Sequence, residues 1–406
     1  MAEWKEGKLG DFAAVKGGKR LPKGSNLISE PNSHPYIRIR DLGKEKVLNI
    51  TNDFEYVDDI TQEKISRYIV DAGDIIISIV GTIGLVGVVG KTLDKANFTE
   101  NCVKLVDIQG MNKEFLYYYL ISTIGQAEIA KRTVGAVQPK LPIKNIQDIR
   151  IRYPELDEQK KIGSILAKID EKISINNRIN NHLLEQVVAL YEHLVTESDW
   201  PIVTIGDIAQ KVAMGPFGSN IKVSTFVSEG VPIISGNHLK EYFLEESEFN
   251  YITVEHAERL KNSIVLPHDI IFTHAGNIGQ VAMIPDTCKY DHYVLSQRQF
   301  YLRCDKTKVV PEFLLMFFHS AIGQHELLSY ANQTGVPSIA QPATNLKKIA
   351  FKCPPFQSQV IWQEQVCPLI GQYLNNRLEN EKLTKLRDTL LPKLMSGELD
   401  VSNIDL

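Results

Sequence analysis

Two long stretches of the chain carry apolar residues alternately three and four positions apart. This spacing is typical of the a/d seam of a coiled coil, and it holds for about four heptads in each stretch. A helix over residues 158–195 is on the order of 57 Å long, and the pattern predicts two such helices that pair. The seam positions are Leu166, Ile169, Ile173, Asn176, Asn180, Leu183, Val187, Leu190 and Leu194, then Val366, Leu369, Tyr373, Asn376, Asn380, Leu383, Arg387, Leu390 and Leu394.

Two asparagines interrupt the middle of each seam, Asn176 and Asn180 in the first and Asn376 and Asn380 in the second. Polar residues at seam positions lower stability and fix register or orientation. If the helices pair antiparallel about a pseudo-twofold axis, the two asparagine pairs lie side by side and share hydrogen bonds, and we predict that pairing. The alternative is that the asparagines face solvent on helices packed against globular domains. Pro368 should kink the second helix or shift its start.

The remainder of the chain is also present twice. A repeat of about 200 residues is too long for a solenoid unit, so it indicates duplication of a whole domain with its connector. The predicted boundaries are 1–155 and 199–355 for the two globular domains (the first head and the second head), 156–198 and 356–396 for the helices, and 397–406 for a tail. The matching segments are 4–13 with 200–209, 70–84 with 265–279, 114–126 with 312–324, and 154–195 with 354–395.

Each head combines short strands with helices. Residues 74–80 and 269–273 are β-branched runs followed by glycines, which is typical of buried strands. Residues 114–132 and 312–330 carry apolar residues at helical spacing. We therefore expect an α+β fold with two tandem domains, each followed by a long helix, the helices pairing as an antiparallel coiled coil.

Composition narrows the class of protein. The 406 residues carry a net charge of -4, so a basic, nonspecific nucleic-acid coat is excluded. Five scattered cysteines without a C-x-x-C pair indicate neither a disulfide framework nor a zinc knuckle. The amino-terminal residues lack the apolar core of a signal peptide, and no run is long and apolar enough for a membrane span. We expect a soluble, cytoplasmic protein with no membrane partner.

Several ordered motifs resemble the specificity (S) subunits of type I restriction-modification systems. The resemblance covers essentially the whole chain, and Ser358 stands where the family usually has Glu. The motifs are residues 8–11 and 204–207, the runs at 73–84 and 268–279, the helix starts at 154–159 and 355–359, and residues 390–399.

That resemblance implies a division of labour between this chain and its partners. Each head would be a target-recognition domain for one half of a bipartite, asymmetric double-stranded DNA site. The helices would set the spacing and hold two methyltransferase (M) subunits, with restriction (R) subunits as further partners. S-adenosylmethionine, ATP and Mg²⁺ are expected in those partners, and no cofactor or metal in this chain, which would be noncatalytic.

Candidate DNA-binding residues come from segments that differ between the heads. The heads carry net charges of +2 and -2, so a phosphate-binding surface must be local. The first set lies in glycine-containing loops, and a solvated surface loop is the alternative: Lys16, Lys19, Arg20 and Lys23, with Ser219, Asn220 and Lys222 in the second head. The second set is Arg38 and Arg40 against Ser235, Asn237 and His238. Arg reads guanine edges and Asn reads adenine, although a strand with one solvent face explains the same pattern.

Two further sets complete the prediction. One follows the helical segments and comprises Lys131, Arg132, Gln138 and Lys140, opposite Asn332, Gln333 and Ser338. The other is His274 and Asn277 beside Gly276, where a histidine in a packed domain is more often structural.

Catalytic signatures fail throughout the chain. Residues 84–92 resemble a phosphate-binding loop, but Leu85 and a fifth spacer residue break the motif. Neither the Asn/Asp-Pro-Pro-Tyr/Phe run of amino-methyltransferases nor a nucleophile elbow is present. Two alternatives to a specificity subunit remain: a coiled-coil scaffold joining two protein-binding domains, and a divergent restriction enzyme with its own active site.

Overall fold

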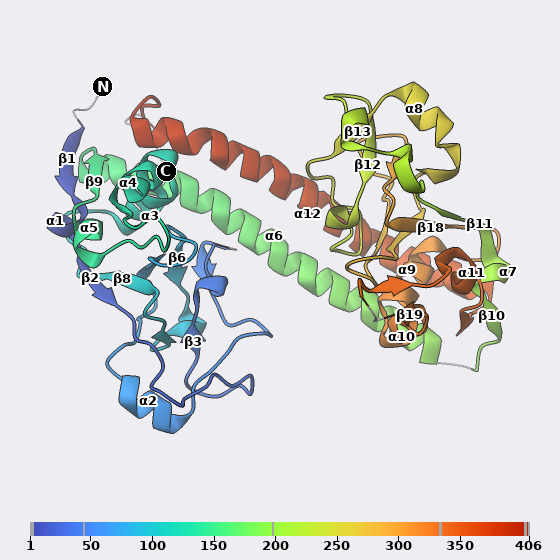
Figure 1. Ribbon diagram of the computed structural model, residues 1–406, viewed down its shortest axis with the longest axis horizontal. Coiled ribbons are helices and arrows are strands. Elements are labelled where there is room, and N and C mark those ends of the chain that lie inside the picture. Colours follow the sequence, from blue (N-terminus) through green and yellow to red (C-terminus); the bar gives the residue numbers. More distant parts are fainter. Residues whose placement is uncertain (1–3, 44, 197–198, 333–334, 402–403, 405–406) are drawn as a thin grey trace. The chain divides into compact units, whose positions relative to one another are not determined.

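The structure is a computed structural model that describes residues 4–43, 45–196, 199–332, 335–401 and 404. The chain forms two compact units, each described here by itself. Unit 1 comprises Met1–Asn177 and Leu378–Leu406, and unit 2 comprises Arg178–Arg377. Each unit therefore contains one head and a piece of both long helices, α6 (Leu156–Thr196) and α12 (Phe356–Ser396), drawn in green and red in Figure 1. The divisions between the units, at 177/178 and 377/378, fall inside α6 and α12.

The first head is built on a five-stranded sheet in the order β2-β8-β5-β6-β4. Ile75 and Ile77 of β5 pack with the helices on one side, and Ile76 packs with Phe98 on the other. Because β5 is covered on both faces, its sequence is a continuous apolar run rather than an alternating one. The strands are β1 (Lys5–Lys8), β2 (Ala14–Gly17), β3 (Tyr36–Ile37), β4 (Val47–Leu48), β5 (Ile75–Ser78), β6 (Val86–Val89), β7 (Asn97–Phe98), β8 (Cys102–Val106) and β9 (Arg150–Tyr153).

The second head repeats this plan with β11-β18-β15-β16 in place of β2-β8-β5-β6. Ile270 and Phe272 of β15 face the helices, and Ile271 faces the other core cluster. A second sheet has the order β13-β12-β17-β14. The strands are β10 (Ile202–Thr204), β11 (Ala209–Met214), β12 (Val231–Ile234), β13 (Asn250–Ile252), β14 (Ile264–Val265), β15 (Ile270–Thr273), β16 (Val281–Met283), β17 (Tyr293–Leu295), β18 (Gln299–Cys304), β19 (Ala331–Asn332), β20 (Ser338–Ile339) and β21 (Ala350–Lys352).

The helical segment of each head is broken in the middle, which the apolar spacing did not predict. Ser122 and Ser320 each accept a hydrogen bond from the backbone N–H three residues later, at 3.2 and 3.1 Å, and so begin a new helix. The residue at that position is Gly125 or Gly323, where a Cβ would lie 2.0 or 1.9 Å from a carbonyl oxygen of the preceding helix. The helices are α1 (Leu9–Phe12), α2 (Asp59–Ile65), α3 (Lys113–Ile121), α4 (Thr123–Arg132) and α5 (Ile143–Gln147), then α7 (Ile205–Ile208), α8 (Val254–Arg259), α9 (Pro311–His319), α10 (Ala321–Leu328) and α11 (Pro342–Leu346).

A buried glutamine fixes the start of each long helix. Gln159 accepts a hydrogen bond from Asn112 N at 2.9 Å and donates to Pro154 O at 2.9 Å. Gln359 makes the same two contacts with Val310 N and Pro354 O, at 3.0 and 2.7 Å. Both long helices begin as predicted, and α12 continues through Pro368 without a later start.

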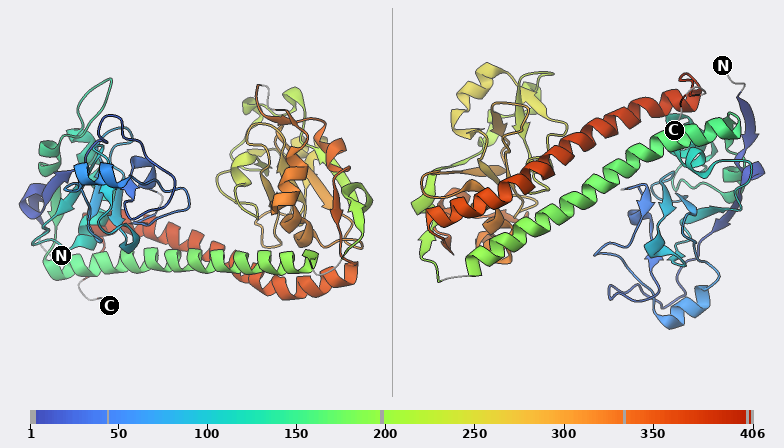
Figure 2. Two further views of the ribbon diagram at one scale, coloured as in Figure 1. Left: turned by 90° about the horizontal axis from the view of Figure 1, so that it is seen from below. Right: turned by 180° about the vertical axis from the view of Figure 1, so that it is seen from behind.

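The two long helices lie side by side in antiparallel order within each unit (Figure 2). In unit 1, Asn176 donates to Asn380 at 2.9 Å, and Asp170 contacts Arg387 at 2.9 Å. Lower numbers on α6 therefore face higher numbers on α12, which confirms the antiparallel pairing.

The corresponding contact in unit 2 is a hydrogen bond from Asn376 to Asn180, at 2.8 Å. Asn176, Asn180 and Asn376 are buried rather than turned to solvent.

The end of α12 completes the core of unit 1. Leu394 and Val401 belong to the same apolar cluster as Leu9 and Phe115 of the first head. The sequence pattern did not predict this contact, because it joins residues almost 400 positions apart.

Candidate nucleic-acid interface

Several residues that match between the heads form internal contacts. Asp74 forms a buried ion pair with Lys104 at 2.8 Å, and the matching Asp269 pairs with Arg303 through two contacts of 2.8 and 2.6 Å. The two aspartates lie at equivalent positions, whereas the two cations lie at different positions of the neighbouring strand. Gln126 of α4 donates to Gly84 O at 3.0 Å, and the matching Gln324 of α10 donates to Gly279 O at 3.1 Å. A surface that distinguishes the heads must therefore come from positions that do not match.

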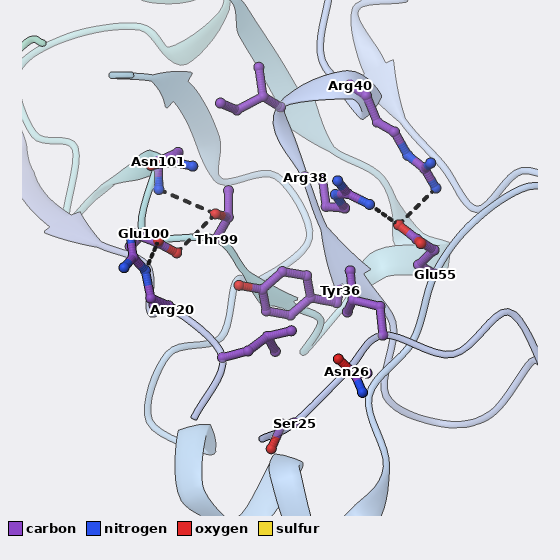
Figure 3. Close-up of a pocket in the computed structure, with 13 residues that line it drawn as sticks. Arg20, Ser25, Asn26, Tyr36, Arg38, Arg40, Glu55, Thr99, Glu100 and Asn101 are labelled. Carbon is purple, nitrogen blue, oxygen red and sulfur yellow. Dashed lines mark hydrogen bonds and ion pairs between the residues drawn. The ribbon is translucent and has the colours of Figure 1, made fainter. Parts of the chain in front are cut away.

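Such positions line a cavity of about 530 Å³ in the first head (Figure 3). Three predicted arginines, Arg20, Arg38 and Arg40, are brought together here from two segments of chain. Polar and aromatic groups complete the lining: Ser25, Asn26, Tyr36, Glu55, Thr99, Glu100 and Asn101, with Leu21, Leu27 and Ile39.

A 3-10 turn at Ile39–Asp41 positions two of these arginines. The carboxylate of Asp41 accepts the backbone N–H of Arg38 at 2.7 Å and so closes the turn. Arg38 then contacts Oε2 of Glu55 through Nη1, and Arg40 contacts the same oxygen through Nη2 at 3.0 Å. Figure 3 shows both guanidinium groups converging on Glu55.

The third arginine lies on the opposite wall of the cavity. Arg20 donates to Glu100 at 2.6 Å, and its side chain is 81% exposed. Between the walls, Tyr36 donates from its hydroxyl to Lys19 O at 2.8 Å. Burial raises the pKa of Tyr36 to about 12, so this hydroxyl stays protonated and neutral at physiological pH.

The predicted lysines of the first head are exposed. Lys16 lies on β2, Lys19 and Lys23 lie in the segment that follows it, and Lys19 Nζ lies 5.4 Å from the ring centre of Tyr68. Lys140 is exposed, and its backbone pairs with Val80 and Val134 to close a surface loop that includes the exposed Gln138.

The Lys131–Arg132 pair has partners of its own. Lys131 contacts Glu128 at 3.1 Å on an exposed helix turn. Arg132 is mostly buried, and it donates to Glu128 O at 3.1 Å and to Asp148 O at 2.6 Å. Because these contacts hold the end of α4 on α5, the structure gives Arg132 a role in packing.

The same turn occurs in the second head with different side chains. Ser235 N donates to Nδ1 of His238 at 2.9 Å, as Arg38 N donates to Asp41, so His238 occupies the position of Asp41. Its Nε2 faces Glu248 O at 3.3 Å, and burial lowers its pKa, so the ring is neutral and structural rather than a group that faces a ligand. The positions of Arg38 and Arg40 are taken by Ser235 and the exposed Asn237.

The position of Glu55 also changes between the heads. Glu55 O accepts the backbone N–H of Tyr36, the second residue before Arg38. Asn250 pairs with Ile233, the second residue before Ser235, so Asn250 corresponds to Glu55. The charged triad Arg38, Arg40 and Glu55 is thus replaced by Ser235, Asn237 and Asn250.

The other candidates in the second head are spread over several loops. Ser219 and Asn220 lie in the turn Gly218–Asn220, and Asn220 O is contacted by His256 at 2.7 Å. Lys222 and Asn277 are exposed. His274 is half-buried against Gln297 O at 3.2 Å, and burial lowers its pKa. Gln333 lies outside the described residues.

Sequence reasoning missed the acidic members of the site. Glu55 and Glu100 face the cavity, although the search was for cations and amides. Their partners lie 15 and more positions away, so no local spacing pattern announces them. The internal repeat did contain a signal, since Arg38 and Glu55 both lose their charge in the second copy.

Comparisons with known proteins agree with the earlier resemblance. A family model described as the type I restriction modification DNA specificity domain matches residues 1–185 and again 197–387. The chain belongs to this family, and it is a specificity subunit with two target-recognition domains.

Two curated relatives align over almost their full lengths. The MjaIX specificity subunit of Methanocaldococcus jannaschii is 24% identical, covering 99% of this chain and 95% of the relative. The HindI specificity subunit of Haemophilus influenzae is 20% identical, covering 98% and 100%. The crystal structure of a type I system S subunit from M. genitalium shares the fold, with a TM-score of 0.57, 16% identity and coverage of 97% and 96%.

The described residues contain neither a membrane-spanning helix nor a cluster of metal ligands. None of the helices there is long and apolar enough to cross a membrane. Over the same part of the chain, no group of three or more His, Cys, Asp and Glu side chains is placed to hold a metal ion.

Proposed function

We propose that each head reads one half of a bipartite, asymmetric DNA site, and that the helix pair sets the spacing and docks two methyltransferase subunits. The observation that carries the proposal is the replacement of Arg38, Arg40 and Glu55 by Ser235, Asn237 and Asn250 on matching turns. Different hydrogen-bonding groups at equivalent places are what two different half-sites require.

Positioning on DNA would come from the exposed lysines of the first head. Phosphate contacts fix the register of a protein on the duplex and carry no sequence information. Because the whole chain has a net charge of -4, DNA affinity of this chain alone is expected to be modest and sensitive to salt. Most phosphate contacts would then come from partner subunits.

The helix pair supports a fixed spacing because its register is specified by side-chain hydrogen bonds. A shift in register would separate Asn176 from Asn380 and Asn376 from Asn180, and so break these hydrogen bonds. Catalysis would belong to the partners: methyltransferase subunits with S-adenosylmethionine, and restriction subunits with ATP and Mg²⁺.

The decisive experiment exchanges one head. Residues 1–155 are replaced by the equivalent domain of another family member, and DNA methylated by the assembled complex is sequenced. We expect one half of the methylated motif to change and the other half to remain. An unchanged motif contradicts the proposal, and absence of a DNA footprint from any complex favours the scaffold alternative.

The spacing is tested by insertion. Four residues added to α6 beside Asn180 should change the number of base pairs between the half-sites while both half-sites keep their sequences. An unchanged gap would contradict the role of the helix pair in spacing.

A further inference from the structure

Resting on the proposed function, we infer that Glu55 determines base preference in the first head. It positions the Arg38 guanidinium for the O6/N7 edge of a guanine and keeps it from phosphates. Glu55 is a positioning residue, and Arg38 is the residue that contacts the base.

The contacts assign different roles to the two arginines. Arg40 is anchored, because it donates to Asp53 O at 2.9 Å and to Glu55 at 3.0 Å, and lies 3.7 Å from Asp41. Arg38 is held at Nη1, the guanidinium nitrogen that contacts Glu55. Its side chain is 42% exposed on the cavity wall, whereas Glu55 is only 21% exposed. A guanidinium fixed at one nitrogen can present its remaining N–H groups to a planar pair of acceptors.

Electrostatics explains why the carboxylate matters for specificity. An unpaired arginine binds phosphate at any sequence, because the attraction between opposite charges carries no base information. Glu55 weakens the attraction of Arg38 for a phosphate, whereas the guanine edge offers neutral acceptors in the bidentate geometry that arginine matches. A guanidinium that is already ordered also loses less side-chain entropy on binding. Glu55 therefore disfavours the wrong ligand and favours the right one.

The second head supports treating these residues as one group. There the position of Glu55 carries Asn250, and the positions of Arg38 and Arg40 carry Ser235 and Asn237. The carboxylate and both guanidinium groups are replaced together, while the turn that carries the two arginines is retained.

The test uses the full chain assembled with its methyltransferase subunits. The probe is a library of duplexes with randomised half-sites, together with one duplex of scrambled sequence. The variants are Glu55→Gln, which is nearly isosteric, and Arg38→Lys, which keeps the positive charge but loses the planar guanidinium that can donate two parallel hydrogen bonds. Arg150→Lys is the matched control, because Arg150 lies in the same head in an exposed pair with Glu6 at 3.3 Å.

Glu55→Gln should lower the preference for guanine at one position of the first half-site by about 5- to 150-fold. It should also raise affinity for the scrambled duplex. The slope of the logarithm of that affinity against the logarithm of salt concentration should become more negative by about one. Arg38→Lys should lower the same preference without raising affinity for the scrambled duplex. Arg150→Lys, and the second half-site in every variant, should behave as in the unmodified protein.

Three results would overturn the inference: no guanine preference in the first half-site of the unmodified complex, a preference that survives Arg38→Lys, or one that survives Glu55→Gln. In each case exchange of residues 1–155 still tests the proposed function separately. If that exchange leaves the motif unchanged, the proposed function fails; if it changes the motif, only the role of Glu55 and Arg38 is lost.

Discussion

The two heads share their interiors and differ at their surfaces. Asp74 and Asp269 lie at matching positions and each forms a buried ion pair, although the cations Lys104 and Arg303 lie at different positions of the neighbouring strand. Gln159 and Gln359, near the start of the long helices, make the same two contacts with backbone groups. Arg38, Arg40 and Glu55 have no charged counterparts in the second head. A buried polar group without a partner costs about 1–3 kcal/mol, whereas most exposed substitutions change stability by less than about 0.5 kcal/mol. Duplicated domains therefore keep their internal hydrogen bonds while their binding surfaces diverge.

The largest expected change in stability comes from breaking the buried ion pair of unit 2, and it should exceed the change from breaking the pair of unit 1. Asp269→Ala should destabilise unit 2 by about 3–5 kcal/mol, because it removes both contacts of Arg303 with a carboxylate that is 1% exposed. Asp74→Ala should cost unit 1 less, because Lys104 keeps Asp71 as a partner at 3.3 Å. Hydrogen exchange with mass spectrometry in increasing denaturant reads each unit separately. Equal losses of stability in the two units would show that the contact of Lys104 with Asp71 does not offset the loss of Asp74.

The two units should also differ in how much stability they lose at acidic pH. Burial lowers the pKa of His319 to about 4, and the ring stacks on Tyr242 and contacts Val281 O at 3.0 Å. A lowered pKa means that this stability is fully present above the ordinary value near 6.5 and is lost as pH falls toward 4. Unit 2 should lose about 3 kcal/mol over that range, because a shift of one unit corresponds to about 1.4 kcal/mol. Ile121 occupies the equivalent position in unit 1 and does not titrate.

The measurement is urea unfolding of each unit at pH 7.5 and at pH 4.5. His319→Ile should reduce the dependence on pH in unit 2, although the other buried histidines leave part of it. The pKa values of His238 and His274 are also lowered by burial, whereas contacts with Glu312 and Asp286 raise that of His268. An unchanged slope in the variant would mean that His319 is not the group responsible.

The helix starts should respond alike in the two units. Gln159→Ala and Gln359→Ala each remove an acceptor from a backbone N–H and a donor from a proline carbonyl, all in buried surroundings. Each substitution should destabilise its own unit by about 1–3 kcal/mol. Unfolding followed by hydrogen exchange would reveal the loss, and a loss confined to one unit would contradict the equivalence of the two starts.

The smallest effect is expected when a whole polar layer is replaced. Asn376→Leu alone should cost unit 2 about 1 kcal/mol, because it leaves the buried amide of Asn180 without its donor. Replacing both residues by Leu should be nearly neutral or stabilising while loosening the register of α6 on α12. Thermal melting gives the stability, and distances between spin labels on the two helices give the register. A clear loss in the double variant, with the register unchanged, would contradict the role assigned to this layer.

The periodicity of the sequence was enough to predict the long helices and the buried strands, because these features depend on apolar spacing that the chain carries locally. The antiparallel pairing was predicted from the asparagine pairs in the middle of both seams. The break at Ser122 and Ser320 was missed because a serine in a helical pattern becomes a cap only when the chain turns. The closure of unit 1 by Leu394 and Val401 was missed because it is a contact between chain ends.

The candidate interface could be predicted only in part. Residue type singled out Arg20, Arg38 and Arg40 in two separate segments, but it did not predict that they line one cavity. Glu55 was missed because its contact with Arg38 depends on a pairing between distant segments. His238 has the composition of a ligand-binding group and instead accepts a backbone N–H, as Asp41 does. Residue type alone does not distinguish a side chain that faces a ligand from one that closes a turn.

The two units also differ in when they can be completed during synthesis. Unit 2 is continuous over residues 178–377, whereas unit 1 needs residues 378–406 in addition to the first 177. At a ribosomal rate of about 5–20 residues per second, roughly 10–40 s separate the appearance of these two parts. During that interval the apolar face that later receives Leu394 and Val401 stays uncovered. The head made first is therefore the last to close, and it is the part of the nascent chain most in need of protection from aggregation.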